Sequence, residues 1–249
     1  MRESIKRTIT LTGRNVKEIM RDPLSLAFTI AMPLFMEIVF YFIFHNLTDQ
    51  FAMKYLAPGI VVFSQSFLSL FVGLLIAVDR GTAFLTRLYV SKAKSYEFIF
   101  GYMLAVLPLA VIQSILFFIV GGIIDNGVFS VNMIYSILVS YVTSAFFIGF
   151  GLLLGSVCNE KAIGGVASIV IAGQSVLSGM WFPKEGLSGG MITVMKCLPF
   201  KNATDLVQNV LTGINNVIDD FVIPFVVVLA YTIVVLTIAV IAFRRKMKA

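Results

Sequence analysis

The chain has 249 residues, of which 59% are apolar and 13% are charged, and its mean hydropathy is +0.96. A water-soluble domain cannot cover so much apolar surface, so these values exclude a soluble protein and indicate an integral membrane protein. The formal net charge of +6 does not indicate a nucleic-acid partner, because the cations lie at the ends of apolar runs.

Residues 1–22 form an amphipathic segment. Apolar residues from Ile5 to Ile19 alternate with cations at roughly helical spacing. Such a segment is typical of a helix that lies along the membrane interface. Asp22 and Pro23 then predict a break, since the residue before a proline is biased away from helix.

Six apolar runs follow, each close to the roughly 20 residues that a helix needs to cross a bilayer core of about 30 Å. The predicted spans are 24–44, 58–78, 96–124, 133–156, 163–181 and 221–243.

Residues 182–220 are too polar to span a membrane, but apolar residues recur at helical spacing on both sides of Pro199. Two short amphipathic helices there are typical of a re-entrant hairpin, which membranes tolerate only where protein buries its backbone. We therefore expect residues 1–249 to form a single transmembrane domain. Its fold would be all-α, with six transmembrane helices, an N-terminal interfacial helix and an extracellular re-entrant hairpin before the last span.

The lysines and arginines lie mostly on one side of the predicted spans. Of the 19 cations, the other side holds only Lys54, Lys184, Lys196 and Lys201. Because cytoplasmic loops carry the excess of positive charge, both termini and residues 79–95 are predicted to be cytoplasmic. Residues 182–220 are predicted to be outside.

Residues 79–95 are a charged island between the second and third spans. Phe84, Leu85, Leu88 and Tyr89 recur at helical spacing and predict a small amphipathic helix over residues 82–90. Its apolar face needs a partner, which can be the lipid interface or a groove on another protein.

Glu37 is the one ionisable residue deep in a predicted span, and it lies on a polar stripe from Ser25 to Tyr41 that repeats every four residues. A carboxylate in lipid is costly, so this stripe is expected to face protein or water. Two interpretations stay open: a contact for substrate or proton, or a protonated or hydrogen-bonded carboxyl that joins spans.

Small and polar residues mark the second and fifth spans. Small residues let helices pack closely, which explains the glycines there and also the Gly151–Gly155 pair of the fourth span. The polar residues can instead line a pathway; they are Gln65, Ser66, Ser69, Gln174, Ser175 and Ser178.

Two other classes of protein fit the sequence less well. The only histidine is His45, and no Cys, His and acid cluster has metal-ligand spacing, which argues against an intramembrane enzyme. A secondary transporter driven by an ion gradient is the stronger alternative, because broken helices occur in that class too.

Several short motifs, in order along the chain, resemble one family. They are Arg21-Asp22-Pro23-Leu24 before the first span; Asp79-Arg80-Gly81-Thr82, Leu85, Arg87-Leu88 and Ser91 before the third; and Ser178-Gly179-Met180-Trp181-Phe182-Pro183, Leu187 and Leu198-Pro199-Phe200 after the fifth. Over almost the whole chain, this order and spacing resemble the type-2 ABC transporter permease family. Ser188 departs from the pattern, since the family often has Pro there, so the first outer turn is expected to differ.

The resemblance implies the membrane subunit of an ATP-binding cassette exporter, which moves a drug-like, lipid, peptide or polysaccharide substrate out of a bacterial cell. It implies that the island is a coupling helix docked on a separate ATPase; the implied contact residues are Asp79, Arg80, Gly81, Thr82, Phe84, Leu85, Arg87 and Leu88. It also places the second and fifth spans along a central cavity.

We therefore predict a substrate pathway that consists of Glu37, Gln65, Ser66, Ser69, Gln174, Ser175 and Ser178. The chain has no G-x-x-x-x-G-K-[ST] phosphate loop, so ATP and Mg²⁺ are expected on the partner ATPase rather than on this chain. The expected partners are ABC ATPase subunits, a second permease subunit in a homodimer or heterodimer, and the lipids of the plasma membrane.

Overall fold

The computed structural model describes residues 2–81, 94–181 and 187–248, and it is helical over most of that length. Nine α-helices lie in the described part: α1 (Arg2–Met20), α2 (Pro23–Phe44), α3 (Met53–Gly81), α5 (Ser95–Ile124), α6 (Val131–Val157), α7 (Glu160–Leu177), α8 (Gly189–Cys197), α9 (Pro199–Thr212) and α10 (Ile223–Lys248). Short 3₁₀ turns, η1 (Asp49–Phe51) and η2 (Asn126–Val128), lie before α3 and α6. A π-helical turn, η4 (Val217–Val222), leads into α10.

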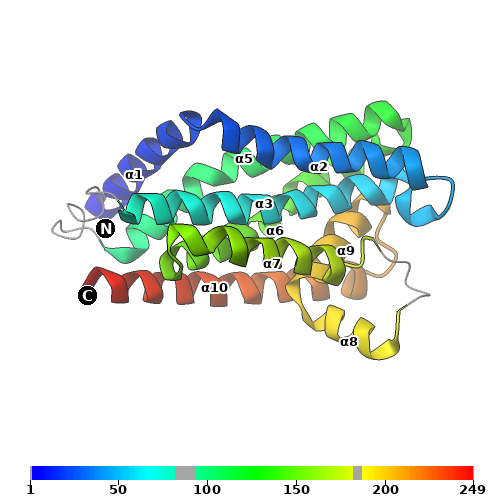
Figure 1. Cartoon of the computed structure of the whole chain (residues 1–249). Coiled ribbons are helices and arrows are strands. Elements are labelled where there is room, and N and C mark those ends of the chain that lie inside the picture. The colour runs from blue at the N-terminus through cyan, green and yellow to red at the C-terminus, as the bar shows by residue number, and fades with distance from the viewer. Residues whose placement is uncertain (1, 82–93, 182–186, 249) are drawn as a thin grey trace.

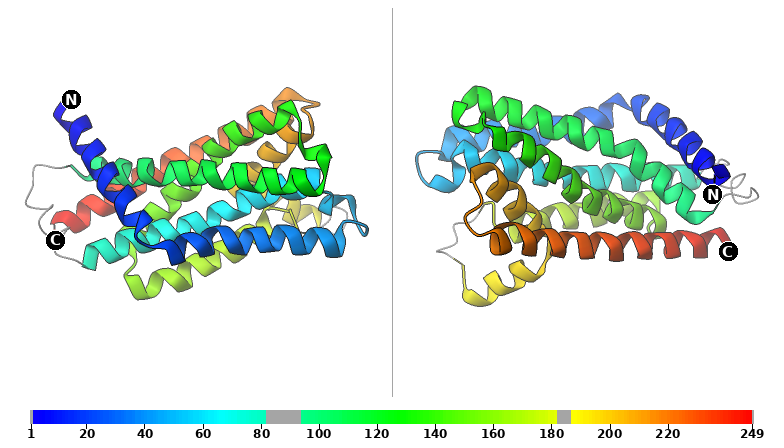
Figure 2. Two further views of the ribbon diagram at one scale, coloured as in Figure 1. Left: turned by 90° about the horizontal axis from the view of Figure 1, so that it is seen from above. Right: turned by 180° about the vertical axis from the view of Figure 1, so that it is seen from behind.

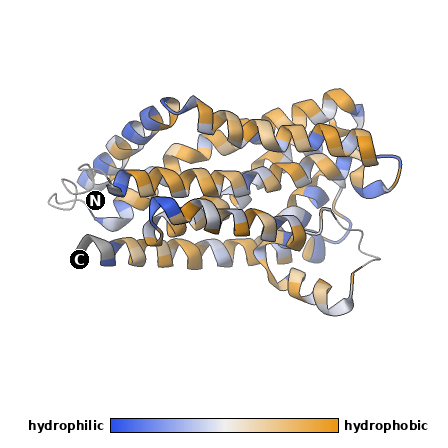
Figure 3. Ribbon diagram, in the orientation of Figure 1, coloured by the Kyte–Doolittle hydropathy of each residue, from blue (hydrophilic) through white to orange (hydrophobic). Residues whose placement is uncertain are grey.

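Six helices are long and apolar enough to cross a membrane: α2, α3, α5, α6, α7 and the continuous segment Val217–Arg245. Apolar residues cover the length of these helices, while hydrophilic residues gather along α1 and at the ends of the bundle (Figure 3). The prediction of six spans is therefore confirmed.

The limits of α3 and α7 depart from the predicted spans for reasons that the backbone shows. Helix α3 begins at Met53, ahead of Pro58, because the N–H groups of Tyr55 and Leu56 already bond to the Ala52 carbonyl at 2.9 and 3.0 Å. Helix α7 ends at Leu177, before the predicted limit at residue 181. Gly179 has a φ of +74°, a conformation that suits glycine and ends the helix.

Helix α3 is the centre of the bundle. Of its apolar window 78% is buried, against 17% for α2 and for α7, and it packs against α2, α5, α6, α7 and α9. Both ends of the chain lie at one end of the bundle, where α3 also ends and α5 begins, and α8 and α9 lie at the other end (Figure 1).

The tightest helix contact joins α3 to α6. A Cβ added to Gly151 would strike the carbonyl of Ser69, and one added to Gly155 would lie 2.7 Å from the carbonyl of Gly73. Two glycines one turn apart therefore let the backbones touch, which confirms the packing role predicted for this pair.

Helices α8 and α9 form a short pair before the last span. Helix α9 packs against α3, α6 and α10, while α8 extends away from the bundle (Figures 1 and 2). The side-chain amide of Asn202 donates to the carbonyls of Lys196 and Leu198 at 2.7 and 2.6 Å, which fixes the turn between the two helices.

Candidate functional site

Glu37 lies where α2, α3 and α5 meet. Its side chain is fully buried, and a Cβ added to Gly121 of α5 would lie 3.2 Å from Glu37 Oε1 and 3.0 Å from Cβ of Ala57. Thr29 and Pro33 of the same stripe are also buried, so the stripe faces protein, as predicted. Both carboxyl oxygens of Glu37 make no hydrogen bond within the described part of the chain.

Gln65 of α3 is different, because α6 satisfies its side chain. Its Nε2 donates to the carbonyl of Ser140 at 3.0 Å, and its Oε1 accepts from Thr143 Oγ1 at 2.9 Å. These two bonds tie α3 to α6 beside the glycine contact. In the single chain, Gln65 therefore joins two helices.

Two other predicted pathway residues, Ser66 of α3 and Gln174 of α7, are buried where these two helices pack together in a seam. Gly73 meets Ile163 near one end of this seam, with 3.5 Å from an added Cβ to Cγ2, and Gly59 meets Met180 near the other, with 3.1 Å to Cε. Ser66 lies midway between the two glycines, seven residues from each, so it is on the same face of α3.

Gln174 lies on the matching face of α7. The three buried residues of that helix are Ile163, Ala167 and Gln174, and their spacing places them on one side. The hydroxyl of Ser66 and both amide atoms of Gln174 are buried and make no hydrogen bond in the described residues, and the same holds for the hydroxyl of Ser69. The middle of this seam therefore contains polar groups that the described chain leaves unsatisfied.

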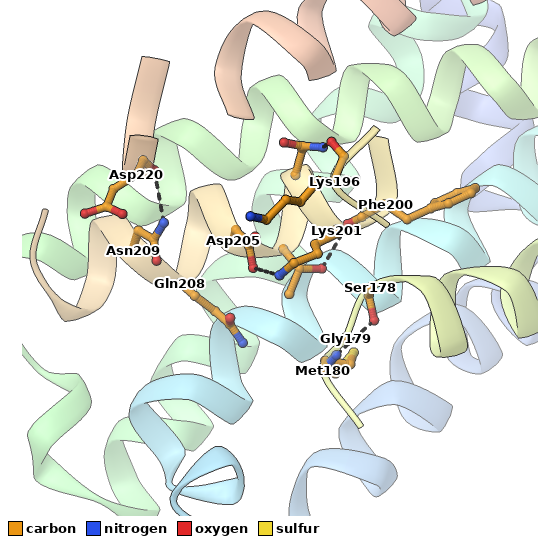
Figure 4. Close-up of polar contacts among 12 residues, drawn as sticks. Ser178, Gly179, Met180, Lys196, Phe200, Lys201, Asp205, Gln208, Asn209 and Asp220 are labelled. Carbon is orange, nitrogen blue, oxygen red and sulfur yellow. Dashed lines mark hydrogen bonds and ion pairs between the residues drawn. The ribbon is translucent and has the colours of Figure 1, made fainter. Parts of the chain in front are cut away.

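The last two predicted pathway residues make local bonds at the end of α7. Ser175 Oγ donates to the carbonyl of Ile171 at 3.0 Å. Ser178 Oγ accepts from the N–H of Met180 at 3.3 Å (Figure 4). Glu37, Gln65 and Gln174 thus lie in three different helix contacts of one chain. The expectation that they share a cavity between two subunits concerns an assembly, and it stays a prediction.

At the end of the bundle that carries the chain termini, two arginines of α1 bind acids of α3 and α5. Arg14 makes a two-pronged ion pair with Asp79 of α3, with Nη2 2.6 Å from Oδ1 and Nη1 bonded to Oδ2. The Tyr102 hydroxyl of α5 donates to the same carboxylate at 2.5 Å. The hydrogen bond to Asp79 raises the pKa of Arg14, although burial acts in the opposite direction.

Arg7 binds Glu97, near the start of α5, in the same way. Its Nε and Nη2 lie 2.9 and 3.0 Å from the two carboxylate oxygens, and Ser4 Oγ donates to Oε1 at 2.5 Å. The Glu97 side chain is fully buried. The hydrogen bond to Glu97 raises the pKa of Arg7. Sequence analysis missed both pairs, although the cations on one face of the amphipathic segment were a signal for them.

Arg80 donates to the end of α6. Its Nη1 lies 2.7, 3.0 and 3.0 Å from the carbonyl oxygens of Gly155, Ser156 and Cys158. Carbonyls at a helix C-terminus lack intrahelical donors, and a cation there is favourable. A Cβ added to Gly81 would meet no atom of the described residues within 4 Å. The other residues of the predicted coupling helix lie outside the described residues; they are Thr82, Phe84, Leu85, Arg87 and Leu88.

At the opposite end, Lys201 and Asp205 of α9 form an ion pair with 2.7 Å between Nζ and Oδ1 (Figure 4). Lys201 is only 8% exposed. Sequence analysis also missed this pair, although Lys and Asp at i and i+4 in a short helix were visible. Within residues 2–81, 94–181 and 187–248, no group of three or more His, Cys, Asp or Glu side chains is placed to hold a metal ion.

Six apolar spans, buried polar groups between them and ion pairs at the bundle ends define a polytopic membrane protein. The model of one family, described as ABC-2 type transporter, matches residues 6–212. Because this match covers well over half of the chain, the chain belongs to the ABC-2 type transporter family, whose membrane domain is a permease without an ATPase domain. The comparison with curated proteins finds no match.

Proposed function

We propose that this chain is the transmembrane subunit of an ATP-driven exporter. Two such subunits, identical or different, would form the pathway, and separate ABC ATPase subunits would bind ATP and Mg²⁺. The substrate would be a drug-like molecule, a lipid, a peptide or a polysaccharide, moved out of a bacterial cell. The family match supports the permease role, and the arrangement around residues 82–93 supports coupling to an ATPase.

The observation that carries the coupling proposal is that α1 holds the chain on both sides of residues 82–93. Asp79 lies three residues before this segment and binds Arg14, and Glu97 lies four residues after it and binds Arg7. A force applied to the segment would therefore reach α3, α5 and α1 together. Such a connection suits the point at which a partner's movement enters the membrane domain.

In this proposal the coupling residues have two roles. Asp79 and Arg80 would position the segment through their contacts at the end of α3, and Gly81, the last residue of α3, would connect it to that helix. Phe84, Leu85 and Leu88 would fill a groove on the ATPase, and Arg80 and Arg87 would meet acids at its rim. A few buried residues carry most of the energy of such an interface.

The pathway proposal rests on the unsatisfied polar groups of α2, α3 and α7. Buried polar groups normally have hydrogen-bond partners, and in a membrane they are rare and often functional. Glu37, Ser66, Ser69 and Gln174 have no such partner among the described residues, and a passing substrate would supply one. Gln65, Ser175 and Ser178 would join them if the helices move apart during transport.

The proposed orientation places the chain termini in the cytoplasm, since that end of the bundle carries most of the cations. Helix α1 would then lie at the inner interface. Helices α8 and α9 would form the outer re-entrant hairpin, with the backbone of α9 covered by α3, α6 and α10.

The experiment is copurification of the ATPase with the detergent-solubilised permease, followed by measurement of substrate-stimulated ATP hydrolysis. Arg87→Glu and Leu88→Ala should each weaken docking, because losing a buried pair or anchor costs about 2–5 kcal/mol, or roughly thirty-fold or more in affinity. Lys161→Glu, an exposed cation at the same end of the bundle, is the matched control. On a lipid surface, one such change would remove only about 1 kcal/mol.

Normal accumulation of both variants, together with uncoupled hydrolysis, would support the proposal. If both variants still couple ATP hydrolysis fully to transport, or if no ATPase copurifies with the parent chain, the proposal of a partner ATPase is wrong. Transport driven by an ion gradient would then be the better account.

A further inference from the structure

A pocket of about 260 Å³ opens between the end of α7, α8 and α9. It has an apolar part, formed by Leu187, Ile192 and Met195, and a polar part, formed by Lys196, Lys201 and Asp205, with Gly179 between them. Pockets for drug-sized molecules have about 300–1,000 Å³. This pocket is therefore large enough for a charged headgroup and the start of a chain, and too small for a whole drug-sized molecule.

Lys201 is the unusual residue of this pocket. It is only 8% exposed, and lysine is almost never so buried unless it is paired. It is also the third residue of α9, with its partner Asp205 one turn further along. A cation near a helix N-terminus opposes the helix dipole, and the stabilising order places the acid first. The stability of α9 therefore does not explain this charge.

Gly179 leaves room beside the ammonium group. A Cβ at this position would lie 3.0 Å from Met195 Cε and 3.9 Å from Lys201 Nζ, and the φ of +74° already disfavours other residues. Because residue 179 is a glycine, the turn after α7 places no side chain over the Lys201 ammonium group there.

The pocket lining carries two lysines and one aspartate, so it is net positive beside an apolar wall. We propose that it binds the headgroup of an anionic amphiphile. A phosphate, sulfate or carboxylate group contacts Lys201 and the exposed Lys196, and the first carbons of the chain lie against Leu187, Ile192 and Met195. The ligand comes either from the lipid leaflet at this end of the bundle or from solution. The site goes beyond the proposed function, because its occupation requires no ATPase.

Trp181 is a built-in reporter, because it is the only tryptophan of the chain. It lies two residues from Gly179 and contacts Phe40, with 4.3 Å between the ring centroids. The chain is purified into nanodiscs of phosphatidylcholine, and water-soluble dihexanoyl phosphatidylglycerol is added while tryptophan emission is recorded. We expect a saturable change with this anionic lipid and none with dihexanoyl phosphatidylcholine.

Two substitutions of the ion pair have opposite expected effects. Lys201→Gln removes the buried cation and should weaken binding about tenfold or more, as expected for the loss of a hydrogen bond to a charged group. Asp205→Asn keeps the lysine and removes the competing acid, so it should tighten binding. Lys54→Gln, at a lysine over the Tyr55 ring and outside the pocket lining, is the matched control and should leave the affinity unchanged.

A second set of nanodiscs contains phosphatidylglycerol in the bilayer and identifies the source. If the bilayer lipid fills the pocket, emission is already changed and the soluble lipid has no further effect. If the soluble lipid still titrates, the ligand comes from solution, and either result supports the site. If the parent and Lys201→Gln bind the anionic lipid with equal affinity, the proposed site is wrong. Weaker binding by Asp205→Asn than by the parent would also contradict it. If Lys201→Gln does not fold, the Asp205→Asn result alone decides.

Discussion

Replacing Arg14 by methionine tests whether charge holds α1 to the bundle. The side chain of Asp79 is 5% exposed and that of Arg14 is 28% exposed, so the pair lies between the exposed and the buried cases. Exposed pairs contribute about 0.2–1 kcal/mol, and breaking a fully buried pair costs about 3–5 kcal/mol. For this two-pronged pair at the edge of the bundle, we expect a coupling of about 2 kcal/mol, which is roughly thirty-fold in an equilibrium constant.

Amide hydrogen exchange of α1 in the purified protein measures this quantity, because local opening controls exchange of a docked helix. Arg14→Met should raise the exchange of α1 by roughly thirty-fold. The double variant Arg14→Met/Asp79→Asn should exchange about as fast as Arg14→Met alone, because the pair is already broken. Lys17→Met makes the same change at an exposed position of the same helix and should have little effect.

The double-mutant comparison isolates the pair from the other contacts of Asp79, such as the bond from Tyr102. The single variant Asp79→Asn completes the comparison. If the double variant exchanges as fast as the product of the two single effects predicts, Arg14 and Asp79 act independently and the reasoning is refuted. An α1 that exchanges no faster in Arg14→Met than in Lys17→Met would also refute it.

Three further outcomes are expected. Glu37→Gln should change transport or substrate preference in a flux assay while the subunits still assemble, because the buried carboxyl lacks a partner in the described chain; a Glu37→Leu variant that transports like the parent would show that the residue is no functional contact. Gly151→Ala should destabilise the protein by about 1–3 kcal/mol, because its Cβ would strike the α3 backbone; Gly164→Ala, in open space, should melt like the parent in a thermal assay. A membrane-impermeant thiol reagent should label Cys197, which is exposed, from outside and should leave Cys158 unlabelled, and labelling of an engineered C-terminal cysteine from outside would contradict this topology.

The six spans were predictable because bilayer thickness sets their length and hydropathy marks them. The buried face of α2 was also predictable, since Glu37 and Thr29 repeat at helical spacing and a carboxyl avoids lipid. In both cases the information is local, within one helix. The limits of α3 and α7 were less predictable, because backbone bonds at Ala52 and the turn at Gly179 decide them.

The distant partners of Arg7, Arg14 and Arg80 could not be predicted in the same way. Arg14 and Asp79 are 65 positions apart, and Arg7 and Glu97 are 90 positions apart. A single sequence gives the charge of each residue but not the tertiary contact that joins them. Arg80 is an example, because its guanidinium binds three carbonyls at the C-terminal end of α6. Every residue has a backbone carbonyl, so residue type does not identify such an acceptor.

The two ion pairs of α1 also set an order of events during synthesis. Helix α1 leaves the ribosome before α3 and α5. Asp79 is synthesised 65 residues after its partner Arg14, and Glu97 is synthesised 90 residues after its partner Arg7. Asp79 becomes available with α3, the second span, and Glu97 with α5, the third span. Before then, an amphipathic helix such as α1 can rest on the membrane surface. Helix α1 is therefore docked later than it is synthesised, and its docking reports that the end of α3 and the start of α5 have reached the same side of the membrane.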